Sequence, residues 1–323
     1  MRALITGGAG FIGSHLAERL LADGHDVAIL DDLSTGQLEN VPEGAEFYEG
    51  DVADQDIARE VRELVVHCNV VFHLAAAVGV KLIVEEPVRT LTTNIRGTEN
   101  ILRAAAIYQR PVVLASSSEV YGQRDDPVPL HEDAARTYGP TTQPRWAYAE
   151  SKALDEFMAL AYTTEYGLDA RIARIFNTVG PRQSGRYGMV VPRFAVQAVT
   201  GGDIEIFGDG KQTRCFCHVS DTVDALIRLA QVPRPMICNI GNPQNHIAIN
   251  DLAETVRGLA GSDSPIVHVR YEDAYGVGIA DMRHRRPNID KAYTELGWEP
   301  KVPLDEILKE AVQAAKTELE VAR

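Results

Sequence analysis

The sequence has little cysteine, no excess of positive charge and no long apolar run. Four cysteines are spread over 323 residues, and only Cys215 and Cys217 stand close together. Structural metal sites need several ligands at recurring spacings, so we expect buried, reduced thiols and no metal site. With 32 basic against 46 acidic residues the formal charge is −14, which disfavours a nucleic-acid partner.

No apolar stretch reaches the roughly 20 residues that a membrane-spanning helix needs. The chain also begins with a strand pattern, without a basic leader before a long apolar run. We therefore expect a cytoplasmic protein with no membrane partner. The 45% hydrophobic and 24% charged residues are ordinary for a globular chain with an ample core.

The first half of the sequence alternates strand and helix patterns. Strand patterns lie at 3–6, 26–30, 46–49, 70–74, 112–115 and 170–175, and helical patterns lie at 11–23, 55–67, 88–108 and 145–166. A helix at 220–231 and a strand at 236–240 look like a return to the same sheet. This alternation predicts an α/β fold of the Rossmann type, a doubly wound parallel sheet with helices on both faces.

After Asn177 the pattern breaks into short pieces that contain proline and glycine, with later helices near 250–260 and 303–319. We expect a smaller C-terminal substrate domain that is interleaved with the sheet. Residues 1–176 and about 215–242 would form the dinucleotide-binding domain, and about 177–214 with 243–323 would form the substrate domain.

A glycine-rich turn follows the first strand pattern. Gly7, Gly10 and Gly13 lie between that strand and a helical pattern that starts at Phe11 and Ile12. At such a turn the helix amides and dipole can hold a pyrophosphate, with no side chain in the way. The turn therefore predicts a dinucleotide site, and an ordinary glycine turn is the alternative.

The second strand pattern ends in Asp31 and Asp32. A carboxylate there can accept hydrogen bonds from the adenosine ribose and would repel a 2′-phosphate. Asp31 therefore predicts NAD rather than NADP, and a helix-cap or loop aspartate is the alternative.

Two further strand ends complete the expected cofactor cleft. Asp51 follows the third strand, where its carboxylate can reach the adenine amino group, and Val52 comes next. Leu74, Ala75 and Ala76 follow the fourth strand and include small residues, as expected where backbone passes close to a dinucleotide.

Tyr148 and Lys152 are four residues apart in a helical pattern and so share one helix face. With the glycine turn they indicate a nicotinamide enzyme that uses a tyrosine base. A free tyrosine has a pKa near 10, and lowering it by about three units requires roughly 4 kcal/mol. Lys152 and the positive nicotinamide ring can supply this by Coulomb attraction. A structural tyrosine between helices is the alternative.

Four motifs occur in order and resemble the extended short-chain dehydrogenases that act on nucleotide sugars. They are the glycine turn at 7–13, the segment 73–76, Tyr148-x-x-x-Lys152, and Arg174-x-x-Asn177-x-x-Gly180-Pro181. The resemblance covers essentially the whole chain. It implies a UDP-sugar substrate whose C4 gives hydride to NAD⁺ while Tyr148 removes the proton of the 4-hydroxyl. It also implies a homodimer through the helices at 88–108 and 145–166, with internal packing of these helices as the alternative.

The segment Ser117-Ser-Glu-Val-Tyr-Gly122 is similar to that of UDP-glucuronate decarboxylases. This resemblance implies that Ser117 or Ser118 binds the substrate and that Glu119 is an acid/base. Arg285, in a basic segment that ends at Pro287, would be the electrostatic partner, and a solvated basic turn is its alternative. Oxidation at C4 makes the C6 carboxylate of a glucuronate a β-keto acid, so loss of CO₂ then needs only orientation, enolate stabilisation and protonation. The product would be UDP-xylose, UDP-4-keto-pentose or a mixture.

The resemblance also implies a set of residues that bind the nucleotide sugar: Asn177, Arg186, Val190, Phe207, Arg214 and Arg285. Arg214 would hold the diphosphate and Asn177 would lie near the sugar phosphate. Phe207 would stack on uracil, although a core aromatic is a fair competitor.

The loop at 78–87 departs from the decarboxylase pattern, because it lacks the segment with proline and tyrosine that approaches the sugar. Glu85 and Glu86 would sit oddly near a substrate carboxylate, whereas Lys81 could bind it. A nucleotide-sugar 4,6-dehydratase is the first alternative function and a 4-epimerase, disfavoured by Glu119, is the second. A non-catalytic NAD(H)-binding regulator is the alternative outside enzymes.

Overall fold

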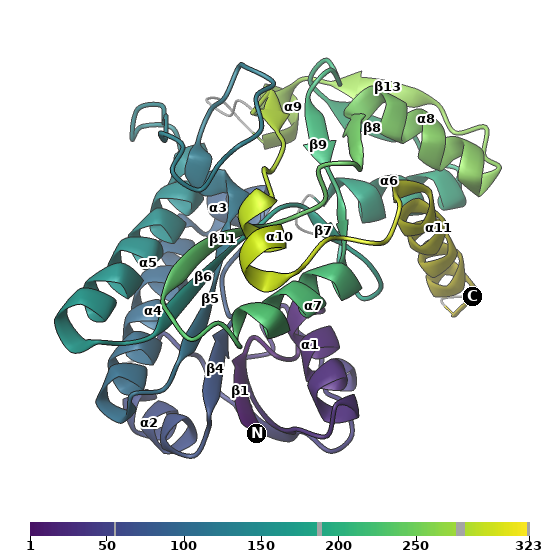
Figure 1. The fold of residues 1–323 in the computed structure, drawn as a ribbon. Coiled ribbons are helices and arrows are strands. Elements are labelled where there is room, and N and C mark those ends of the chain that lie inside the picture. Colours follow the sequence, from purple (N-terminus) through teal and green to yellow (C-terminus); the bar gives the residue numbers. More distant parts are fainter. Residues whose placement is uncertain (55, 186–188, 276–281, 322–323) are drawn as a thin grey trace.

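The computed structural model describes residues 1–54, 56–185, 189–275 and 282–321 of the chain. A seven-stranded sheet forms its centre (Figure 1). All of its strands pair in parallel. Their order across the sheet is β11 (Met236–Ile240), β6 (Ala170–Ile175), β5 (Val112–Ser117), β4 (Val70–His73), β1 (Arg2–Thr6), β2 (Asp26–Asp31) and β3 (Glu46–Glu49).

The central strands are apolar along their whole length because helices cover both faces of the sheet. Ala3, Leu4 and Ile5 of β1 are completely buried, and Ile5 lies in register between Ile29 and Phe72. The core on one face includes residues of two helices, α1 (Phe11–Ala22) and α7 (Val219–Leu229). The core on the other face includes residues of α2 (Ala58–Val66), α4 (Pro87–Tyr108) and α5 (Arg145–Tyr166).

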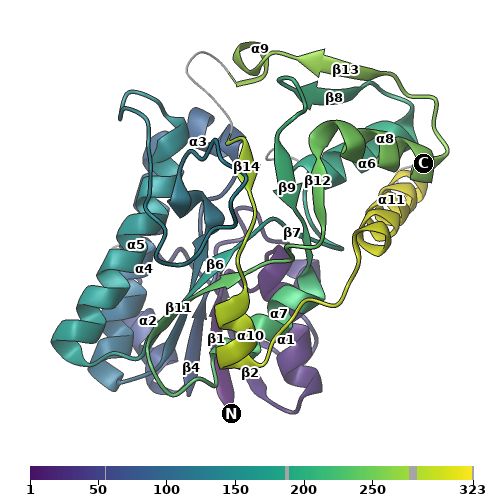
Figure 2. The same ribbon diagram turned by 45° about the horizontal axis from the view of Figure 1, so that its top comes forward.

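A second, smaller half lies beyond the carboxyl ends of these strands (Figure 2). Its core is shared by three helices, α6 (Val190–Thr200), α8 (Ile249–Ala260) and α11 (Leu304–Val321). Its strands are β7 (Thr178–Val179), β8 (Ile204–Phe207), β9 (Thr213–Cys215), β10 (Cys217–His218), β12 (His246–Ala248), β13 (Ile266–Val269) and β14 (His284–Arg285). The pairing of β9 with β14 places Arg214 directly beside Arg285.

The short elements complete the chain: η1 (Leu38–Asn40), η2 (Ser118–Tyr121), α3 (Val80–Glu85), α9 (Tyr271–Tyr275) and α10 (Asp290–Leu296). Late in the chain, α10 returns to the large sheet. Its Ala292 and Leu296, with Trp298 just after it, are buried in the same core as α1 and α7. The two halves are therefore joined by several passages of the chain.

The predicted α/β fold with a parallel Rossmann-type sheet is confirmed. Among the described residues, four α-helices were not predicted: α3, α6, α9 and α10. The apolar run in α3 fits a short strand as well as a helix. In α6, Pro192 looks like a helix breaker, yet it occupies the first turn, where its missing N–H is not needed.

Two further findings bear on the class of protein. No helix among the described residues is both long enough and apolar enough to cross a bilayer. All four cysteines are buried and free.

Candidate active site

The glycine turn packs tightly against the end of the fourth strand. Gly7 has φ +73°, and a Cβ there would lie 2.7 Å from the amide nitrogen of Ala75. A Cβ on Gly13 would lie 2.1 Å from the carbonyl oxygen of Gly7. Gly10, the N-cap of α1, has only that same oxygen nearby, at 3.2 Å from its Cβ position. These residues fit a dinucleotide, because the turn is compact and the amide end of a 12-residue helix stays open.

Asp31 ties this turn to the second strand. Its Oδ2 accepts a hydrogen bond from the Ala9 amide at 3.0 Å and its Oδ1 accepts one from the Leu33 amide at 2.9 Å. Burial raises the pKa of Asp31, and these two amides oppose the change. The carboxylate is therefore fixed at the rim of the expected adenosine site.

A cavity of about 160 Å³ adjoins Asp31, and we call it the adenosine-side cavity. Its lining includes the residues expected at the strand ends: Asp31, Asp32, Asp51, Val52, Ala75 and Ala76. Glu85 and Glu86 line this cavity as well. The two glutamates therefore lie on the adenosine side of the loop, and their carboxylates do not conflict with an acidic sugar.

A larger cavity of about 370 Å³ lies at the nicotinamide end of the cleft, and we call it the sugar-side cavity. It brings together most of the expected catalytic and substrate-binding residues: Ser117, Ser118, Glu119, Tyr148, Asn177, Val190, Phe207, Arg214 and Arg285. Phe11, Ile12, Leu74 and Ala76 line it from the cofactor side. Arg186 and the side chain of Lys81 lie outside the described residues.

Glu119 sits between two guanidinium groups in the wall of this cavity. Arg145 makes two hydrogen bonds to the carboxylate, one of them from Nη2 to Oε1 at 3.1 Å. Arg285 Nη1 donates to the same Oε1 at 3.1 Å, and its Nη2 donates to Asn177 Oδ1 at 2.7 Å. Burial raises the pKa of Glu119, but the charges and hydrogen bonds of Arg145 and Arg285 outweigh burial and lower the pKa to about 2. In this arrangement Glu119 is a carboxylate, which can accept a proton but has none to donate.

Arg145 was not predicted as a site residue. It is the first residue of α5 and lies three positions before Tyr148. That spacing places two side chains on the same helix face, so the signal was present in the sequence.

Tyr148 is a weak base in this arrangement. Burial raises the pKa of its phenol, and the negative charges of Glu119 and Asp155 raise it further. A hydrogen bond with Ser117 and the charge of Arg285 act in the opposite direction. Lys152 Nζ lies 2.8 Å from Asp155 Oδ2. In the sequence Asp155 follows Lys152, whereas Tyr148 precedes it.

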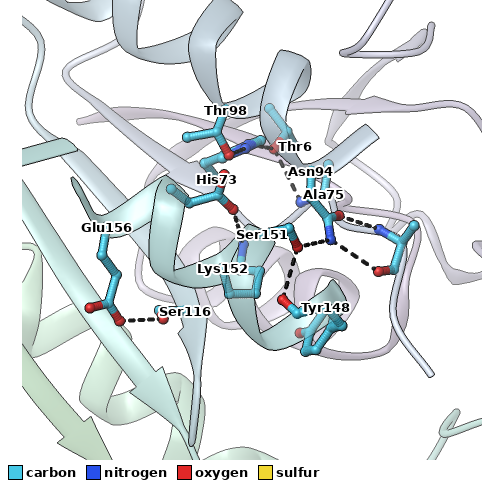
Figure 3. A network of polar contacts seen from close by, with 12 residues as sticks. Thr6, His73, Ala75, Asn94, Thr98, Ser116, Tyr148, Ser151, Lys152 and Glu156 are labelled. Atoms are coloured by element: carbon cyan, nitrogen blue, oxygen red, sulfur yellow. Dashed lines mark hydrogen bonds and ion pairs between the residues drawn. The ribbon is translucent and has the colours of Figure 1, made fainter. Parts of the chain in front are cut away.

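A buried polar network connects α5 and α4 to the cofactor strands (Figure 3). Asn94 donates to Ser151 Oγ at 3.1 Å, and His73 contacts the hydroxyls of Thr6 at 2.7 Å and Thr98 at 3.1 Å. Burial, helped by the charge of Lys152, lowers the pKa of His73 to about 3, so the ring is neutral. The network holds the end of β4 in place, because the Thr6 hydroxyl also accepts the Ala75 amide at 3.3 Å.

The far end of the sugar-side cavity is rich in arginine. The Arg193 guanidinium lies over the Phe207 ring, 4.0 Å from its centre. Arg214 Nη1 donates to the carbonyl oxygens of Thr213 at 2.8 Å and Met282 at 2.9 Å. Among the described residues of the lining, four arginines accompany a single carboxylate, that of Glu119. The cavity therefore suits an anionic ligand.

Comparison with known proteins gives consistent matches. The model of the NAD dependent epimerase/dehydratase family matches residues 3–241. A UDP-N-acetyl-alpha-D-glucosaminuronate decarboxylase from Bacillus cytotoxicus is 41% identical over 317 residues, which cover 97% of each chain. UDP-glucuronic acid decarboxylase 1 from Xenopus tropicalis is 38% identical over 99% of this chain and 73% of that protein.

Solved structures agree with these matches. UDP-glucose 4-epimerase from Thermotoga maritima, determined with UDP-glucose, superposes with a TM-score of 0.87 at 31% identity and covers 99% of this chain and all of that one. The Thermus thermophilus UDP-glucose 4-epimerase in complex with NAD gives the same TM-score and identity over 98% of this chain and 99% of that one.

Proposed function

Because the chain belongs to the NAD-dependent epimerase/dehydratase family, we propose that it removes CO₂ from UDP-glucuronate after oxidation at C4. The observation that carries this proposal is the ionised Glu119 between Arg145 and Arg285, in the same cavity as Tyr148. A 4-epimerase only moves hydride and needs no such group. A decarboxylase must orient a carboxylate, stabilise an enolate and supply a proton at C5.

Each residue of the site has its own role in the proposed reaction. Tyr148 takes the proton of the 4-hydroxyl, while Ser117 and Ser118 orient that hydroxyl from the end of β5. Arg285 and Arg145 stabilise the negative charge that develops when CO₂ leaves. Glu119 holds both guanidinium groups in place, and the proton that C5 takes up after CO₂ leaves comes from water. NAD, held by the glycine turn and Asp31, supplies the hydride acceptor at C4.

The arginines at the far end bind the rest of the substrate. Arg214 and Arg193 neutralise the diphosphate. The base would lie beside Phe207, on the ring face that Arg193 does not cover. Asn177, which Arg285 contacts, links the diphosphate end to the catalytic end.

A second substrate is supported by one observation. The Bacillus cytotoxicus relative at 41% identity acts, by its name, on the sugar that carries an N-acetyl group. UDP-N-acetylglucosaminuronate is therefore the alternative to UDP-glucuronate, with the same chemistry at C4, C5 and C6.

The test is mass spectrometry of the protein incubated with NAD⁺ and each of the two UDP-uronates, separately and in competition. We expect a product lighter by CO₂, and the ratio of the two products in competition identifies the preferred sugar. The Tyr148→Phe variant is the control for contaminating activity. An unchanged mass with both uronates contradicts the proposal, and loss of water from a UDP-hexose would identify a dehydratase.

We also propose a homodimer through α4 and α5. Leu154, Phe157 and Leu160 recur every three residues along α5 and are all exposed, Phe157 at 58%. Exposed apolar side chains on one helix face are typical of a subunit interface. Light scattering should give the dimer mass for the parent chain and the monomer mass for Phe157→Glu.

The free and buried cysteines support a cytoplasmic location, because disulfides are rare where thiols are kept reduced. The division into domains expected from the sequence also stays a proposal. We place residues 290–298 with the dinucleotide-binding half, since they share its core.

A further inference from the structure

The helix that carries the catalytic tyrosine also carries a buried carboxylate that the proposed reaction does not use. Asp155 is completely buried, and its Oδ2 lies 2.8 Å from Lys152 Nζ. Its Oδ1 is buried and makes no hydrogen bond of good geometry with the described residues, and the hydroxyl of Thr98 is the other hydrogen-bonding group at this carboxylate. Lys152 itself is only 2% exposed. The two charges therefore face each other without access to water.

Tyr148, Lys152 and Asp155 follow one another at intervals of four and three residues. Residues with this spacing form one stripe along a helix. Lys152 thus lies on this stripe between Tyr148 and Asp155, and it pairs with Asp155, whose Oδ2 is 2.8 Å from its Nζ. A buried carboxylate depends on its cation, because removing either member of a buried ion pair is costly. The ion pair with Asp155 therefore fixes where the ammonium group of Lys152 lies.

Other charged and titratable groups also face this stripe from the elements packed against α5. They are Glu119 on η2, Arg285 on β14, His73 on β4, Arg174 on β6, and Arg145 and Glu156 on α5 itself. Most of them are already balanced. Glu119 is paired with two arginines, Glu156 binds Arg174 at 2.7 Å, and His73 is neutral. Lys152 differs from these arginines, because its partner Asp155 lies on the same stripe of the same helix.

We propose that Asp155 is a positioning residue that competes with Tyr148 for the ammonium group of Lys152 and so withholds positive charge from the tyrosine hydroxyl. This inference rests on the proposed role of Tyr148 as the base. The base must lose its proton, so activity rises with pH through the tyrosine transition. Asp155 moves that transition to higher pH.

The experiment is a pH titration of the NAD-bound protein labelled with ¹³Cζ-tyrosine and followed by NMR. The signal of Tyr148, one of eleven tyrosines, is identified by its absence in Tyr148→Phe. We expect Asp155→Asn, which keeps the shape but removes the charge, to lower the pH of the Tyr148 transition by about one unit. The low-pH limb of NAD reduction should move by the same amount. The titration needs no substrate, so its failure is distinguishable from a failure of the proposed decarboxylation.

Glu150→Gln is the matched control, because it makes the same charge change on an exposed position of the same helix. It should change the pH of the Tyr148 transition by less than about 0.2 pH units, since water screens an exposed charge. A transition that is unchanged or raised in Asp155→Asn would overturn the proposal, because it would mean that Asp155 serves to keep Lys152 charged.

A second measurement is made on the parent protein, so it does not depend on whether Asp155→Asn folds. The chain has seven lysines, so ¹³Cε-lysine NMR of the parent protein gives few signals, and Lys152→Met identifies the one of Lys152. At pH 7 we expect the Lys152 signal to be that of an ion-paired ammonium group, because Asp155 Oδ2 lies 2.8 Å from its Nζ. A neutral Lys152 near pH 7 would contradict the proposal, because a neutral amine has no charge to share.

Discussion

The adenosine-side cavity is lined by residues between Leu30 and Thr93 only, whereas the lining of the sugar-side cavity extends from Phe11 to Arg285. The first is shaped by strand ends and small side chains. The second depends on charged side chains such as Glu119, Arg145 and Arg285, which come from three different elements. The cofactor is thus held mainly by backbone geometry, and the sugar mainly by a charge arrangement that exists only after the chain has folded. Substitutions should therefore affect the two cavities in different ways.

The largest effect is expected on the sugar side alone. Tyr148→Phe removes the base and should lower the rate of NAD reduction with substrate about 10³-fold. NAD affinity should stay within about threefold, since the adenosine-side cavity does not include Tyr148. Stopped-flow absorbance at 340 nm and calorimetric NAD titration measure the two quantities. A variant that still reduces NAD at a tenth of the parent rate would show that another group is the base.

On the adenosine side, a single added methyl group should destabilise the fold. Gly7→Ala places a Cβ 2.7 Å from the Ala75 amide nitrogen at a φ of +73°. We expect a loss of about 3 kcal/mol in the free energy of unfolding, from strain and from displacement of the β4 end.

Gly10→Ala is the matched control, because the nearest atom to its Cβ is 3.2 Å away and its φ is −80°. It should cost less than about 1 kcal/mol of stability while it weakens NAD binding, since its Cβ enters the space for the pyrophosphate. Urea unfolding and NAD titration separate the two outcomes. Equal stability losses for the two variants would contradict the packing argument.

The next prediction separates oxidation from decarboxylation within the sugar side. Glu119→Gln keeps the shape of the side chain but removes the charge between Arg145 and Arg285. We expect NAD reduction to persist and CO₂ release to slow about 10²-fold. Rapid-quench analysis of the nucleotide products follows both steps. Decarboxylation at the parent rate would show that Glu119 has no part in this step.

The smallest predicted effect concerns His73, which supports the cofactor side from within the core. Its pKa is about 3 in the folded protein and 6.5 in the unfolded chain, so the unfolded chain binds the proton first as the pH falls. The contribution of His73 to stability is complete above pH 6.5 and is lost progressively toward pH 3. Between pH 7 and pH 5 the loss amounts to about 2 kcal/mol.

Chemical denaturation of the parent and of His73→Gln at both pH values measures this contribution. The variant should lose about 2 kcal/mol less than the parent on acidification. An equal loss in both proteins would show that His73 is accessible to protons in the folded state.

The difference between the adenosine-side and sugar-side cavities also explains what could be predicted from the sequence. The cofactor side depends on residues close together in the sequence, so the glycine turn, Asp31 and the strand ends were readable from local patterns. The parallel sheet with helices on both faces followed from the alternation of strands and helices, and the bounds of β3, β6, α5 and β11 were predicted to the residue.

Long-range contacts explain what was missed. The family resemblance indicated Arg285 as the electrostatic partner, and the structure pairs it with Glu119. Nothing near Glu119 in the sequence shows that Arg145 also meets its carboxylate, or that the carboxylate cannot be an acid there. Asp155 was not singled out in the sequence, yet it is completely buried on a helix against which α4 packs. The pKa of a group depends on such neighbours, and neighbours in space are what a single sequence shows least.

The return of α10 to the large sheet affects how this protein unfolds. Because Ala292, Leu296 and Trp298 fill the core of the first half from near the end of the chain, that half is incomplete until almost all of the chain has been made. The Trp298 indole donates to the Asp221 carbonyl oxygen at 3.0 Å, and the Asp221 carboxylate accepts the amides of Lys301 and Val302, also at 3.0 Å. We therefore expect the two halves to unfold together, in a single calorimetric transition. Cutting the chain between β11 and α10 should leave neither half able to refold alone.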